Sequence, residues 1–276
     1  MSRYFDHLIL CLGCLIMVGP VLGLMGQVLS DPDLSRQIRA MFSADLTLGY
    51  HIDLWQMLGN SLVLAFGVAA LACMLSLLAA FALVFFPLPG REWLFGVILM
   101  AMFFPIETRI LPSFAVVHQL GLSNTHAGMI LPVVASGLGV LVFRQFLKQI
   151  PKELMEAARL DGARPLRCLW DILLPMSAPM VAALFSIFFV LGWNQYVWPL
   201  MLSTTRQDMV TVVSGVTRAG AGSTEGQVLA LLALVPPGLV MVISQRWLMR
   251  DTQGCLISES LFLCKISCFS QRTLWI

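Results

Sequence analysis

The sequence predicts an all-α membrane protein with six transmembrane helices, and three observations point to this fold class. Hydrophobic residues make up 58% of the 276 residues and charged residues only 12%, which is more apolar side chain than the core of one soluble domain of this size can bury. Apolar runs of about 20 residues, the length that crosses a hydrocarbon layer about 30 Å thick, recur along the chain. Lysine and arginine are distributed unevenly between these runs.

The six expected spans each correspond to one apolar run. The first run is interpreted as a retained span rather than a signal peptide, because it exceeds a typical signal-peptide core and no A-x-A-like cleavage site follows it. Pro236 and Pro237 lie inside the last run and predict a kink between packed helices. The runs cover about residues 8–29, 58–86, 93–117, 127–146, 179–202 and 228–249.

The orientation of the spans follows from their flanking charges. With six spans, both termini share one side of the membrane with the second and fourth loops. That side, together with the span ends that border it, holds 12 of the 17 lysine and arginine residues and the other side holds four, while Arg109 falls inside the third span. Because positively charged loops stay in the cytoplasm, we expect a multi-pass protein with both termini cytoplasmic.

Motifs for catalysis or cofactor binding are missing from the sequence. No glycine-rich phosphate-binding motif of the P-loop type occurs, nor a serine-hydrolase motif or paired metal ligands. Cys11 and Cys14 have a metal-like spacing, but on an apolar helix they are interpreted as packing residues. We therefore expect no catalytic residue, no metal, no cofactor bound by this chain and no nucleic-acid partner.

The fourth loop, residues 147–178, has helix signals of its own. Pro151 suits a helix start and Gly162 a helix end, so a short helix is expected over about 151–161, with a second starting near Pro165. The side chains Leu154, Ala157, Ala158 and Asp161 share a flat face of the first helix. Such a face favours close contact with a partner protein, and a solvated linker helix is the alternative.

The stretch EAARLDGARPLRCLWDILLP in this loop resembles the signature of the membrane subunits of binding-protein-dependent ABC importers. The resemblance implies a type I ABC importer permease architecture, in which the short helix is a coupling helix that docks into the ATP-binding subunit. The residues that match the signature are Glu156, Ala157, Ala158, Gly162, Ile172, Leu174 and Pro175.

Other motifs extend this resemblance over about residues 5–250. FPIETRILP, GLSNTHAGMILP and GWNQYVWPL look like those of the sugar and polyol importers, and most like the second permease subunits of glycerol-3-phosphate importers. The resemblance implies a second permease as heterodimer partner, two ATP-binding subunits that hold ATP and Mg, and a periplasmic or extracellular substrate-binding protein. It also implies the bacterial cytoplasmic (inner) membrane. Residues 1–250 form the expected permease domain, and 251–276 an atypical, disordered tail.

Polar side chains inside two predicted spans are candidates for a substrate pathway. Glu107 and Arg109 lie between Pro105 and Pro112, where a broken helix can line a cavity and the guanidinium can meet a phosphate. A structural ion pair between the two is the alternative. Asn194 and Gln195 lie in an aromatic-rich stretch that suits hydroxylated ligands, and an interfacial aromatic belt is the alternative there.

Two other functions compete with an importer subunit. A secondary transporter would use Glu107 as a proton site, but the chain lacks matching discontinuous segments in its two halves. A membrane-embedded enzyme lacks a candidate nucleophile or metal set.

Overall fold

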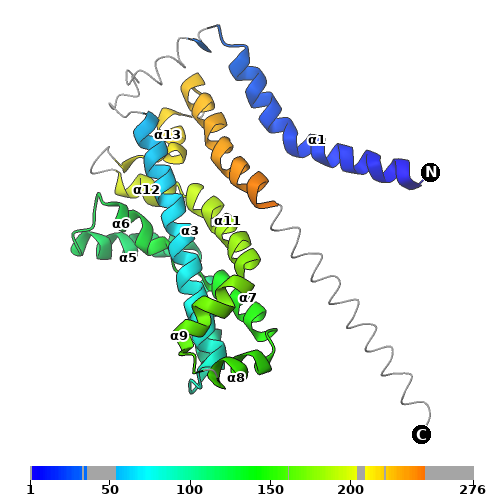
Figure 1. Ribbon diagram of the computed structural model, residues 1–276. Helices are drawn as coiled ribbons and strands as arrows, with labels where there is room; N and C mark the ends of the chain where they lie inside the picture. The colour runs from blue at the N-terminus through cyan, green and yellow to red at the C-terminus, as the bar shows by residue number, and fades with distance from the viewer. Residues whose placement is uncertain are drawn as a thin grey trace. The chain divides into compact units, whose positions relative to one another are not determined.

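A computed structural model describes residues 2–32, 34–35, 54–160, 162–203, 209–220 and 222–245 of the chain. Every regular element within these ranges is helical, and no strand occurs in them (Figure 1). The all-α prediction is confirmed for this part of the chain.

Three helices in the described ranges are long and apolar enough to cross a membrane. They are Asp6–Leu29 within α1 (Ser2–Leu29), α3 (Leu54–Phe85) and the helix Thr224–Gln245. Two bent pairs also qualify if each is one span, which raises the number to five. One pair is His126–Val133 with α7 (Gly137–Lys148), and the other is Pro165–Met176 with α11 (Ala178–Trp193).

The third predicted span is not one helix. The apolar run at 93–117 is divided into α4 (Arg91–Met102) and α5 (Ile106–Gln119). The break has a local cause, because Pro105 has no N–H to donate and disfavours a helical conformation at the residue before it. At 1.5 Å per residue, neither helix crosses a layer about 30 Å thick on its own.

The described ranges also contain shorter elements. They are α6 (His126–Ile130), a 3-10 turn (Leu131–Val133), α8 (Lys152–Leu160), α9 (Pro165–Cys168), a π-helical turn (Leu169–Leu173), α10 (Leu174–Met176), α12 (Val197–Leu202) and α13 (Val212–Ala219).

The chain divides into two compact units, which are described separately. The first comprises the described residues of Met1–Phe66, Ile110–Ile130 and Leu191–Gly238. Polar side chains of α3 hold the segment around Val210 in this unit: Asn60 Nδ2 donates to the Val210 carbonyl at 3.1 Å, and Ser61 Oγ accepts the Val212 N–H at 2.8 Å. Its buried apolar cluster consists of Val28, Leu54, Met57, Val210, Val212, Val228 and Leu229.

The second unit comprises the described residues of Gly67–Arg109, Leu131–Val190 and Leu239–Ile276. Here α4 packs against α7, and Leu83 at the end of α3 joins Phe95 and Val140 in a buried cluster. Helix α7 also approaches α3 closely at Gly139, where a Cβ would collide with the Ser76 side chain. This unit therefore contains the fourth loop together with the helices that support it.

We expect Gly139→Ala to destabilise the protein, because the added methyl group would overlap Ser76 and force α7 away from α3. Overpacking of this kind costs about 1–3 kcal/mol. Thermal unfolding of the detergent-solubilised protein measures the effect. Gly96→Ala on α4 is the matched control, since no neighbouring atom lies within 4 Å of the place that its added methyl group would occupy. Equal unfolding temperatures for the two variants would contradict the close contact.

Candidate functional site

The fourth loop folds into the helices that its local signals predict. Helix α8 (Lys152–Leu160) follows Pro151, and α9 begins at Pro165. Gly162 has φ +75°, a left-handed conformation that glycine adopts without strain, and the Ala163 N–H behind it donates to the Ala158 carbonyl at 3.0 Å. Gly162 therefore ends α8 through its backbone conformation.

One side of α8 packs inside the chain. Met155 and Ala158 are buried, 8% and 6% exposed. They line an apolar cavity of about 180 Å³ together with Phe81 and Phe85 at the end of α3. Cys168 of α9 lines the same cavity, and its Sγ lies 3.4 Å from the Met155 Sδ. The fourth loop is thus anchored to α3 through this side of α8.

The position of Ala158 corrects one expectation. We expected it on a flat face open to a partner, but its side chain faces the aromatic end of α3. A small residue suits this place because it lets α8 approach α3 closely. Leu154 is half-buried, the Ala157 side chain lies outside the described part of the structure, and Asp161 is not among the described residues.

The opposite side of α8 is open to contact. Glu153, Glu156 and Leu160, spaced i, i+3 and i+7, share this side and are all exposed. Leu160 is 88% exposed, although it lies outside every predicted span. Leu160 is not among the residues predicted from the sequence, although its spacing of four from Glu156 already places both on one face.

The end of the signature lies at a sharp bend. Ile172 belongs to the π-helical turn, and Leu174 and Pro175 belong to α10. Ile172 and Leu174 are half-buried, and Pro175 is exposed. The chain bends by 81° between Pro165–Met176 and α11. At the bend, Ser177 Oγ donates to the Leu173 carbonyl at 2.8 Å. These signature residues therefore lie where the loop joins a membrane helix.

Arg109 lines a cavity of about 410 Å³ within the second unit. The half-buried arginine contributes the cationic group, and Ser76 and Ser136 contribute hydroxyls. Ser136 caps the start of α7, where its side chain accepts the Gly139 N–H. The remaining lining residues are Leu75, Ala79, Ile98, Ala101, Met102, Phe104, Ala135, Gly137 and Val140.

The Arg109 cavity lies at one end of both α4 and α7. It is bordered by the last residues of α4 and the first residues of α7, each of which has 12 residues. Twelve residues of helix span about 18 Å, more than half of a hydrocarbon layer about 30 Å thick. The cavity therefore lies about 18 Å, one helix length, from the opposite ends of α4 and α7.

Glu107 lies in α5, but its side chain is outside the described part of the structure. Its pairing with Arg109 thus stays a prediction. Among the described residues, no three His, Cys, Asp or Glu side chains are grouped closely enough to hold a metal ion.

The aromatic-rich stretch lies in the first unit, at the break between α11 and α12. Trp193 and Trp198 are buried, and their indole N–H groups donate to the carbonyls of Ala233 at 2.9 Å and Met129 at 3.0 Å. Trp198 is therefore a packing residue and not part of an interfacial belt. Asn194 follows the end of α11 and is exposed, although it lies inside a predicted span, and Gln195 is half-buried.

Comparison with known proteins finds a matching family and close relatives. The profile of the family described as "binding-protein-dependent transport system inner membrane component" matches residues 72–254. The sn-glycerol-3-phosphate transport system permease protein of Agrobacterium fabrum is 38% identical over 269 residues, which covers 90% of this chain and 95% of that protein. The protein of the same name from Yersinia pestis is 36% identical over 272 residues, with 89% and 94% covered.

A solved structure has the same fold. It is the crystal structure of a bacterial ABC transporter involved in the import of the acidic polysaccharide alginate, and one of its chains matches with a TM-score of 0.71. The match covers 89% of this chain and 95% of that chain at 19% identity. At this identity the likeness concerns the fold alone.

Proposed function

Since the chain belongs to the family of binding-protein-dependent transport system inner membrane components, we propose that it forms part of the translocation pathway for sn-glycerol-3-phosphate or a related sugar or polyol. As a member of this family it is a membrane subunit of a transporter and not an enzyme. The observation that carries the substrate assignment is its 36–38% identity, over about nine-tenths of the chain, to permeases named for that solute.

The importer would consist of four kinds of subunit. This chain and a second permease form a heterodimer in the bacterial inner membrane, two copies of an ATP-binding subunit hydrolyse ATP with Mg, and a soluble binding protein delivers the solute. Six spans with cytoplasmic termini and a permease domain at 1–250 complete the proposal, and the charge distribution supports this orientation. The tail at 251–276 is outside the described residues, and we assign it no role.

Helix α8 is the proposed coupling helix. Its inner side, which carries Met155 and Ala158, is anchored to α3. A force on its outer side, which carries Glu153, Glu156 and Leu160, can therefore reach a membrane helix. Glu156 and Leu160 on the outer side offer a charge and an apolar contact to an ATP-binding subunit. Gly162 ends α8 in the middle of the loop, and the signature residues Ile172, Leu174 and Pro175 lie where the loop joins α11. Ala157 belongs to the same signature.

Arg109 is the proposed contact for the phosphate group. A guanidinium is suited to a phosphate, and the surrounding cavity has room for a small polyol as well as two hydroxyls for hydrogen bonds. Glu107, Asn194 and Gln195 are proposed as further pathway residues on their polar chemistry within predicted spans.

Uptake by the complete importer tests this function. Proteoliposomes that contain both permeases and the ATP-binding subunit are supplied with the binding protein and labelled sn-glycerol-3-phosphate. We expect uptake that requires ATP and the binding protein. Inhibition of this uptake by an unphosphorylated polyol would assign the pathway to a related polyol instead. Uptake driven by a proton gradient without ATP would instead establish the secondary-transporter alternative, which the comparisons do not support.

A further inference from the structure

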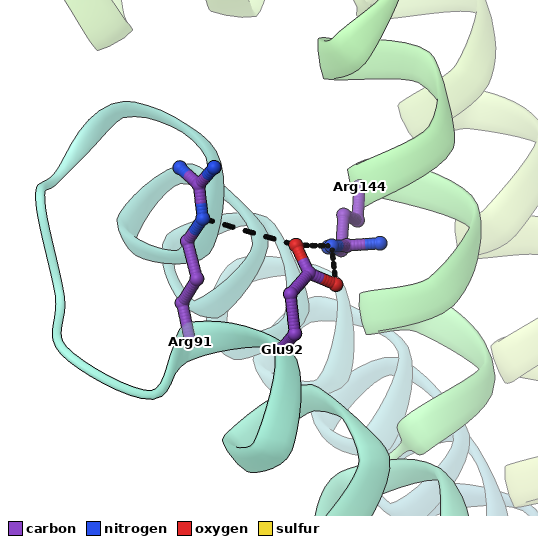
Figure 2. A network of polar contacts seen from close by, with 3 residues as sticks. All are labelled: Arg91, Glu92 and Arg144. Atoms are coloured by element: carbon purple, nitrogen blue, oxygen red, sulfur yellow. Dashed lines mark hydrogen bonds and ion pairs between the residues drawn. The ribbon is translucent and has the colours of Figure 1, made fainter.

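An ion pair joins α4 to α7 in the second unit (Figure 2). Arg144 on α7 donates from Nη2 to both carboxylate oxygens of Glu92, at 2.7 and 2.6 Å. The guanidinium also lies over the ring of Phe95, 4.0 Å from its centroid. Glu92 and Phe95 are three residues apart on α4, so one turn of that helix offers a carboxylate and an aromatic face to the same cation.

The two partners differ sharply in exposure. The Arg144 side chain is 4% exposed and the Glu92 side chain 65%. Burial of a cation is costly unless it is paired, and the Arg144 Nε is buried with no hydrogen-bond partner in the described part of the chain. The Nε of Arg91 also lies 3.8 Å from the Glu92 Oε1, but the Arg91 side chain is half exposed. Arg144 therefore depends on Glu92 for its charge compensation.

The helices that carry this pair also border the Arg109 cavity. The end of α4 contributes Ile98 and Met102 to the cavity, and the start of α7 contributes Gly137. Glu92 and Arg144 lie toward the opposite ends of the same two helices. Because helices are stiff, a change in their spacing at the ion pair alters the width of the cavity at the other end.

The pair also lies next to the proposed coupling helix. Only three residues separate the end of α7 from the start of α8. A second cavity, of about 370 Å³, opens between them, and its lining includes Glu92 of α4, Lys148 of α7 and Glu156 of α8. This space beside the Glu92 carboxylate lets α8 be displaced without a direct clash with α4.

We propose that Arg144 and Glu92 are positioning residues for transport: their ion pair fixes the spacing of α4 and α7 and transmits a displacement of α8 to the Arg109 cavity. The proposal rests on the coupling role proposed for α8. It assigns to the pair a function that differs from holding the fold together, and the two roles give different outcomes when both charges are removed.

The test compares four variants in the complete reconstituted importer. The single variants Glu92→Gln and Arg144→Met each remove one charge of the pair. The double variant combines both substitutions and removes both charges. Glu92→Asp keeps the negative charge on a shorter side chain. Gln145→Met is the matched control, because it places the same side chain at the neighbouring exposed position of α7. For each variant, assembly of the complex and the number of solute molecules imported per ATP hydrolysed are measured.

We expect the double variant to assemble like the parent, since no charge is left unpaired, but to import about tenfold less solute per ATP, a typical size for coupling between sites. Glu92→Asp should also lower the number of solute molecules imported per ATP, and Gln145→Met should leave that number unchanged. If the double variant imports the normal number of solute molecules per ATP hydrolysed, the ion pair has only a structural role. If the double variant fails to assemble, a normal ratio in Glu92→Asp overturns the proposal. Failure of the parent complex to import solute with ATP would refute the proposed function itself.

Discussion

Replacement of Leu160 by aspartate is expected to abolish ATP-driven uptake while the chain still folds and enters the membrane. The side chain is 88% exposed on the outer side of α8, so folding loses little when it is replaced. In a complex, burial of a leucine contributes about 1.5–3 kcal/mol, and a carboxylate at the same place adds a desolvation cost. A loss of about 2 kcal/mol weakens the contact about thirtyfold.

Two measurements on Leu160→Asp separate docking from folding. The amount of variant chain in the membrane reports on folding, and the amount of ATP-binding subunit that co-purifies with it reports on docking. Leu160→Met is the control, because it keeps an apolar side chain of similar volume. Normal co-purification and uptake by the aspartate variant would show that the outer side of α8 is not the docking surface.

The structure gives a different meaning to a substitution on the inner side of α8. Ala158→Trp is attractive from the sequence as a way to block a partner, because the alanine lies on a small flat face. Since Ala158 is buried against the end of α3, a tryptophan there would disrupt packing within the chain. Loss of transport in that variant would therefore say nothing about the partner.

Local signals are enough to predict the helices of the fourth loop. Pro151, Gly162 and Pro165 act on the backbone within a few residues of themselves, and the structure has helix boundaries at all three. The direction in which α8 faces depends instead on Phe81 and Phe85, which are some 70 residues away in the chain. No periodicity within the loop itself identifies that neighbour.

Long-range pairing also explains why the sequence is misleading about Arg144. From the sequence it counts as one of the cytoplasmic positive charges that orient the chain, and such a residue is expected to be solvated. In the structure it is buried and paired with Glu92, 52 residues earlier. The proposed roles of Glu156, Gly162, Glu107 and Arg109 stay predictions, because they concern partners and a solute outside the chain.

Arg109→Gln is expected to eliminate uptake of the phosphorylated solute while the protein level stays normal. A charge-assisted contact to a phosphate is among the stronger hydrogen bonds in proteins, and truncation of one partner of a buried charge pair costs about 2–5 kcal/mol. Met102→Leu is the control, because it changes another residue of the same cavity at nearly constant volume.

A double-mutant cycle with Glu107 decides between a phosphate contact and an ion pair. If Arg109 holds the phosphate, addition of Glu107→Gln to Arg109→Gln does not restore uptake, because the cation that meets the solute is still missing. If the two side chains pair with each other, Arg109→Gln alone leaves a carboxylate unpaired inside the membrane and lowers the protein level. Removal of both charges then recovers much of that loss. Uptake restored in the double variant would assign Arg109 to the structure, and normal uptake in the single variant would exclude both roles.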